Sequence, residues 1–80
     1  MEKQTYNAKE ALDSDAVAQL VQAANQFDSV VLLNKGDKTA NAKSIMGMMS
    51  LNVKAGESVT VSADGTDANK VLPALEDFFK

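Results

Sequence analysis

The sequence contains no histidine and no cysteine. Without imidazole it lacks the side chain that most often serves as a general base near neutral pH. Without a thiol it can form no disulfide, no thiolate metal site and no cysteine nucleophile. We therefore expect a protein that needs no metal and no cofactor, that is not an enzyme, and that acts by binding partners.

Positive charge is scarce, and long apolar runs are absent. Eight lysines and arginines stand against eleven acidic residues, which gives a net charge of −3. Binding to DNA or RNA requires clustered cations, so direct nucleic-acid binding is disfavoured. No stretch approaches the roughly 20 apolar residues that cross a bilayer, and the N-terminus does not resemble a secretion signal. We expect no membrane association and a cytoplasmic location.

The bulk composition is that of one folded domain. Hydrophobic residues make up 45% of the chain and charged residues 24%, which is ordinary for a globular protein and unlike a disordered one. A chain of 80 residues is near the size at which a single core only just offsets chain entropy. We expect residues 1–80 to form a single domain that is stabilised by packing alone.

Apolar spacing predicts strands and one helix in the first half of the chain. Residues 2–8 alternate weakly, which favours an edge strand. Residues 15–27 carry apolar side chains at the spacing of an amphipathic helix, namely Val17, Leu20, Val21, Ala24 and Phe27. Residues 29–33 and 38–42 flank a Gly36–Asp37 turn, and together they predict a hairpin.

The next segment predicts a short helix and a strand. Ser44 is placed to cap a helix that begins at Ile45 and that Gly47 keeps weak or short. After a turn, residues 59–63 alternate apolar and polar side chains. This alternation predicts a strand with one buried face.

A final helix completes the predicted fold. It starts at Thr66 or Asp67 and buries an apolar side made of Val71, Leu72, Leu75, Phe78 and Phe79. Pro73 removes a backbone hydrogen bond, so a bend or a displaced boundary is expected there. The order β-α-β-β-α-β-α predicts an α+β fold, an antiparallel sheet with its helices on one face.

Three polar side chains are candidates for chemistry. Asp13 and Asp15 precede the first predicted helix, where carboxylates commonly cap free N–H groups and pair with the helix dipole. They could instead point towards one ligand. Ser44 presents a hydroxyl at a helix start, which is either a plain cap or a regulatory phosphorylation site.

The short helix is rich in methionine. Ile45, Met46, Met48 and Met49 give it apolar cover on more than one face, and methionine suits surfaces that adapt to several partners. We expect some of these side chains to point inward and the others to form an exposed apolar patch. A patch of this kind on a globular domain is typical of a protein interface.

The segment NAKSIMGMMSL at residues 41–51 closely resembles the region around the regulatory serine of the HPr family, the small phosphocarriers of the bacterial sugar phosphotransferase system. Further similar segments follow in the same order, namely EKQTY, LVQAANQFDS, GESVTVSADGTD and ALEDF. The resemblance covers almost the whole chain. It implies an open-faced β-sandwich with four antiparallel strands and three helices.

The family's phosphorylated loop has the form G-I-H-A-R-P, and here it reads A-L-D-S-D-A. Alignment back from Leu20 places Asp13 at the histidine position, Asp15 at the arginine position and Ala16 at the proline position. The segment before Asp13 is also slightly shorter than in the family. Loss of the histidine with retention of the serine motif resembles the Crh type, the catabolite repression HPr.

This resemblance implies that HPr kinase/phosphorylase modifies Ser44 and that the product binds catabolite control protein A. Ile45, Met46 and Met49 would supply apolar contacts, with Ala18 and Gln22 on the neighbouring helix. The expected state is a monomer or weak dimer. Replacement of the family arginine by Asp15 inverts a charge. The inversion is expected to repel a phosphate or an acidic partner by roughly 1–3 kcal/mol if the groups are close.

Three alternatives remain open. Asp13 could carry a phosphoryl group in place of histidine, since carboxylates form such intermediates. Asp13 and Asp15 could form a constitutive negative patch that mimics a phosphorylated relative. The chain could also be a diverged copy that has lost its partners.

Overall fold

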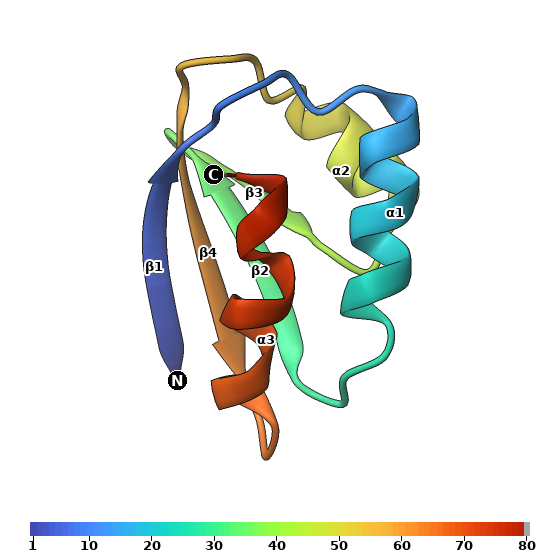
Figure 1. Ribbon diagram of the computed structural model, residues 1–80, viewed down its shortest axis with the longest axis vertical. Coiled ribbons are helices and arrows are strands. Elements are labelled where there is room, and N and C mark those ends of the chain that lie inside the picture. The colour runs from blue at the N-terminus through green and yellow to red at the C-terminus, as the bar shows by residue number, and fades with distance from the viewer. Residues whose placement is uncertain (80) are drawn as a thin grey trace.

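The structure is a computed structural model that describes residues 1–79. Its elements are, in order, β1 (Glu2–Asn7), α1 (Ser14–Ala24), β2 (Val30–Lys35), β3 (Lys38–Asn41), α2 (Ile45–Leu51), β4 (Ser58–Asp64), α3 (Ala68–Leu75) and the 3-10 helix η1 (Glu76–Phe78). This order of strands and α-helices is the one that the sequence predicts. Figure 1 shows the arrangement.

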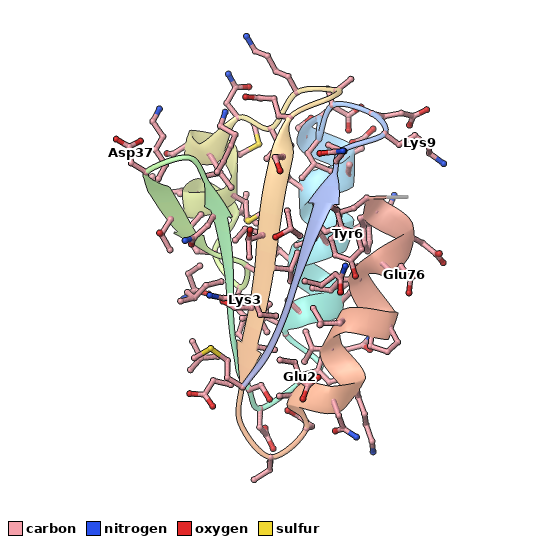
Figure 2. The ribbon with its side chains drawn as sticks, turned by 90° about the vertical axis from the view of Figure 1, so that its left-hand side faces the viewer. Glu2, Lys3, Tyr6, Lys9, Asp37 and Glu76 are labelled. Carbon is pink, nitrogen blue, oxygen red and sulfur yellow. The ribbon has the colours of Figure 1, made fainter. Side chains whose placement is uncertain are left out.

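Within residues 1–79 the strands form one sheet of order β1-β4-β2-β3, in which every neighbouring pair is antiparallel. The helices lie over one face of the sheet, as Figures 1 and 2 show. The opposite face is open. The hydroxyls of Thr5 and Thr60 are 2.9 Å apart there, and Val30 is 57% exposed. The predicted α+β fold with an open-faced antiparallel sheet is confirmed.

The core lies between the sheet and the helices. Because side chains alternate along a strand, β4 directs one set of residues inward, namely Val59, Val61 and Ala63. They meet the buried side of α1, which consists of Val17, Leu20, Val21 and Ala24. The ring of Tyr6 from β1 stacks on Phe79 with centroids 5.4 Å apart. This contact joins the first strand to the end of the described chain, and Figure 2 shows Tyr6 on the side that faces α3.

Helix α1 ends at Ala24, before the predicted end at Phe27. Asn25 closes the helix, and the next bonds are shorter turns from Gln26 N–H to the Ala23 carbonyl and from Phe27 N–H to the Ala24 carbonyl. These turns keep Phe27 packed against the core. The apolar spacing therefore continues past the end of the helix, which explains the overlong prediction.

Helix α3 runs through Pro73 and ends at Leu75, where the 3-10 helix η1 takes over. The bond that a proline cannot donate would have gone to the carbonyl of Asn69. Both Asn69 and Pro73 are exposed, so water can satisfy that carbonyl. The predicted boundary at Pro73 is therefore not found, because the α-helix continues through the proline to Leu75.

Candidate functional site

Ser44 is the N-cap of α2, as predicted. Its backbone is extended, with φ −115° and ψ 118°, and its Oγ accepts a hydrogen bond from the N–H of Gly47 over 3.2 Å. The Ser44 carbonyl accepts the first helical bond, from Met48 N–H, at 3.0 Å. A hydroxyl has a proton and two lone pairs. The cap therefore uses one lone pair of the Ser44 hydroxyl, and the other remains available at this half-buried residue.

The turn before Ser44 is fixed by hydrogen bonds. The side-chain oxygen of Asn41 accepts from Lys43 N–H at 2.9 Å, and the Asn41 carbonyl accepts from Ser44 N–H at 3.0 Å. Ala42 is fully buried, and its N–H bonds to the carbonyl of Val31 in β2. The residues that precede the serine are therefore held on the sheet, and Ser44 has a defined position.

Lys43 ties this turn to the end of α1. Its ammonium donates to the Phe27 carbonyl at 2.6 Å. From the other side, the Asn25 amide donates to the carbonyls of Val21 and Lys43. This tether was not predicted. A lysine bound to a distant backbone carbonyl leaves no local pattern by which the contact could be found.

The methionines of α2 divide as predicted. Met48 is 1% exposed and belongs to the core, whereas Ile45 is 52%, Met46 83% and Met49 46% exposed. We call Ile45, Met46 and Met49 the methionine patch. It follows directly on Ser44 in the chain, so the hydroxyl and an apolar surface are presented together.

The predicted contact residues on α1 are accessible. Ala18 and Gln22 are both exposed, and their four-residue spacing places them on one face of the helix. Helix α1 packs against α2. The structure thus leaves Ala18 and Gln22 free on the helix that adjoins the one carrying the methionine patch.

Asp13 caps α1, and its carboxylate accepts from Ala16 N–H at 2.8 Å. The preceding residue, Leu12, donates its N–H to the Val53 carbonyl at 3.0 Å, which fastens this loop beside the segment that follows α2. Asp15 lies exposed in the first turn of α1. Capping and dipole pairing, one of the two predicted roles, are therefore what the geometry shows. Among residues 1–79 no group of three or more His, Cys, Asp or Glu side chains is arranged for a metal ion.

The Asn25 amide donates to the carbonyls of both Val21 and Lys43. The residue before Ser44 is therefore linked to the C-terminal half of α1, whereas Asp15 lies in the first turn of that helix. The repulsion of a phosphate by Asp15 stays a prediction.

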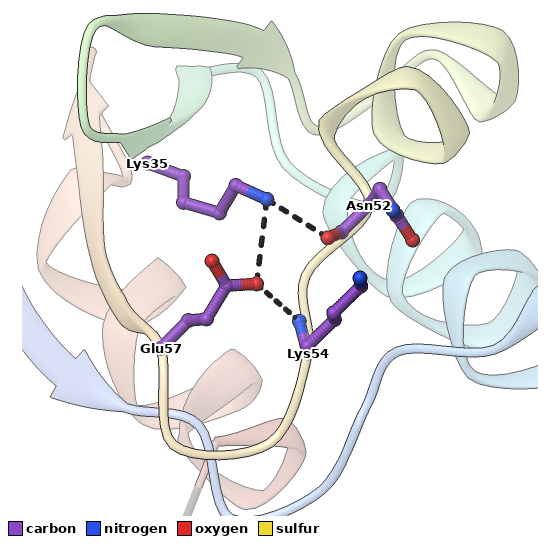
Figure 3. Close-up of polar contacts among 4 residues, drawn as sticks. All are labelled: Lys35, Asn52, Lys54 and Glu57. Atoms are coloured by element: carbon purple, nitrogen blue, oxygen red, sulfur yellow. Dashed lines mark hydrogen bonds and ion pairs between the residues drawn. The ribbon is translucent and has the colours of Figure 1, made fainter.

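The far end of α2 is fastened by a polar cluster, shown in Figure 3. Asn52 ends the helix in the left-handed region at φ 52°, and its carbonyl accepts from the Lys35 ammonium at 2.9 Å. Lys35 also pairs with Glu57 at 3.3 Å. The Glu57 carboxylate accepts from Lys54 N–H at 2.7 Å. This backbone bond, helped by Lys35, lowers the pKa of Glu57.

Nearly the whole chain matches one known protein family. The family model described as the phosphorylation site of the HPr component of the phosphotransferase system (PTS) matches residues 2–80. The chain belongs to the HPr family. Within this family, the chain is similar to proteins of the Crh type. The HPr-like protein Crh of Bacillus subtilis is 45% identical over 74 residues, which cover 92% of this chain and 87% of Crh.

Solved HPr-family structures share the fold. The phosphocarrier protein HPr of Bacillus anthracis superposes with a TM-score of 0.89 at 36% identity, covering 99% of this chain and 96% of that chain. Crh of Bacillus subtilis, solved as an intertwined dimer with a swapped domain, superposes with a TM-score of 0.80 at 42% identity. That match covers 99% of this chain and 91% of the Crh chain. In this HPr-family chain no histidine stands at any position.

Proposed function

We propose that this chain is an HPr-like regulatory protein of carbon catabolite control, a single cytoplasmic domain whose binding is set by phosphorylation of Ser44. The observation that carries the proposal is the pairing of an ordered Ser44 hydroxyl with the exposed methionine patch. Family membership supports a role linked to the phosphotransferase system. The absence of histidine removes the phosphohistidine route and leaves the serine. No helix among residues 1–79 is long and apolar enough to cross a membrane.

Phosphorylation would convert the site from neutral to strongly anionic. A phosphoserine carries about −1.5 to −2 charges at pH 7 and three strong acceptor oxygens. Beside it, Met46 and Met49 offer flexible apolar side chains. A fitting partner therefore has basic groups for the phosphate and an adjacent apolar pocket. We propose that HPr kinase/phosphorylase performs the modification and that catabolite control protein A is the partner, with Ile45, Met46, Met49, Ala18 and Gln22 at the interface.

Modification of Ser44 is tested with purified protein, a cognate HPr kinase and ATP, followed by intact mass measurement. The proposal predicts a gain of one phosphate by the wild type. Ser44→Ala should gain none, and Ser50→Ala, an exposed serine in the same helix, should behave like the wild type. Absence of a gain in the wild type, or a gain that persists in Ser44→Ala, contradicts the proposal.

A second candidate rests on the exposed Asp13 and Asp15. Both side chains lie at the start of α1, so they form a constant negative surface that needs no modification. If the chain is such a phospho-mimic, the wild type and Ser44→Ala bind the same partners equally well. Pull-down experiments with the two proteins distinguish this role from regulation by phosphorylation. A role for Asp13 as phosphoryl carrier is less well supported, because its carboxylate already caps α1. Failure to take label from phosphoenolpyruvate through enzyme I would exclude that role.

We further propose that the protein is a monomer or weak dimer. The basis is that β1 is an edge strand held to the sheet by β4 alone, and that Crh of Bacillus subtilis forms an intertwined dimer. The ring contact of Tyr6 with Phe79 favours the closed monomer. Light scattering after size exclusion over a range of concentrations measures the balance, and a dimer that persists on dilution would overturn this assignment.

A further inference from the structure

Gly47 is a glycine that neither the backbone nor the packing of α2 requires. It lies within the helix, and it is not among the glycines with positive φ, which are Gly36, Gly56 and Gly65. A Cβ at residue 47 would lie no closer than 3.4 Å to its nearest neighbouring atom, an ordinary van der Waals distance. Alanine is the better helix former at such a position. The fold alone would therefore be served better by alanine.

The atoms that a Cβ would meet are those of the modification site. They are Ser44 Oγ at 3.4 Å, Ser44 Cβ at 3.5 Å and Asn41 N at 3.7 Å. One lone pair of Ser44 Oγ is already used by the Gly47 N–H. A phosphoryl donor must bring its phosphorus to about 3–3.5 Å from the remaining lone pair. A methyl group at residue 47 would occupy part of that same shell.

We infer that Gly47 is a positioning residue for the modification of Ser44: its missing side chain keeps open the side from which the phosphoryl donor reaches the hydroxyl. This inference rests on the proposed function. In the step concerned, Ser44 Oγ forms a bond to the γ-phosphorus of a nucleoside triphosphate. The bond from that phosphorus to the bridging oxygen breaks, a nucleoside diphosphate leaves, and the hydroxyl proton passes to a base of the kinase.

The test compares Gly47→Ala with the wild type and with Ser50→Ala in steady-state phosphorylation by HPr kinase and ATP. Ser50→Ala also places alanine in α2, but six residues after Ser44, which corresponds to roughly 9 Å along a helix. We expect Gly47→Ala to lower kcat by roughly ten-fold or more, as small displacements of reacting groups do. KM for the protein substrate should stay within about a factor of two, because the methionine patch is unchanged. Ser50→Ala should match the wild type in both constants.

Three other kinetic outcomes would overturn the inference. Equal kcat for Gly47→Ala and the wild type would overturn the inference, as would a rise in KM alone, which would place residue 47 in docking. A similar loss of kcat in Ser50→Ala would assign the effect to a stiffer helix and would also overturn it. Thermal unfolding checks that Gly47→Ala is folded. If the wild type takes no phosphate, the proposed function fails, which the same assay shows separately from the comparison of variants.

Discussion

Helix α2 has a buried side and a side proposed to bind partners. Substitutions at Met46 and Met48 test this difference. Both belong to the same helix, but Met48 is 1% exposed and Met46 is 83% exposed. Replacement of each by alanine changes helix propensity equally, so the difference between the two variants reports burial. Truncation of a buried methionine to alanine costs about 2–5 kcal/mol. A surface substitution usually stays within about 0.5 kcal/mol.

The consequence for this small domain is large. At about 0.05–0.15 kcal/mol per residue, its total stability is on the order of 4–12 kcal/mol, so Met48→Ala should remove a substantial share. Urea unfolding measures the change through the midpoint at an unchanged slope. Met46→Ala should unfold like the wild type. In its phosphorylated form, it should bind catabolite control protein A more weakly than the phosphorylated wild type does. Equal unfolding midpoints for the two variants, or weaker binding by a fully folded Met48→Ala alone, would refute the division.

Three further predictions concern the stability of the fold. The pKa of Asp67 is lowered, mainly because the Ser29 hydroxyl donates to its carboxylate. The ionised carboxylate therefore stabilises the fold near neutral pH, and this stabilisation is lost as the pH falls through the region in which aspartate protonates. Thermal unfolding should show the loss of stability at low pH, and Asp67→Ala should show a smaller loss than the wild type. Gly65→Ala should destabilise the protein by at least about 1–3 kcal/mol, because φ is +155° and a Cβ would lie 2.6 Å from Ser29 Oγ. A denaturant unfolding midpoint equal to that of the wild type would contradict this. Ser44→Ala should lose about 1 kcal/mol through loss of its cap, and an unchanged unfolding midpoint would show that the hydroxyl does not hold the helix.

The elements were predictable because each depends on a local pattern. The apolar spacing of residues 15–27 and the alternation of residues 59–63 follow from helix and strand geometry. Ser44 was recognisable as a cap because short oxygen-bearing side chains satisfy free N–H groups at a helix start. The exposure of part of the methionine-rich segment was predictable from its excess of apolar side chains over the faces that one short helix can bury.

Long-range polar contacts were not predictable. Asp67 precedes α3 but makes no side-chain cap there; instead its carboxylate accepts from the N–H groups of Asp28 and Ser29. Lys43 reaches the Phe27 carbonyl in the same way, across a turn distant in sequence. Such pairings depend on tertiary placement, and single-residue chemistry does not specify them.

The central claim, that phosphorylation of Ser44 sets partner binding, is tested most directly by calorimetric titration of catabolite control protein A with the modified and the unmodified protein. The account predicts that the Ser44-phosphorylated form binds at least about ten-fold more tightly, which corresponds to about 1.4 kcal/mol. It also predicts that this difference shrinks as salt is added, because the phosphate contact is electrostatic. Equal affinity of the two forms would contradict the account.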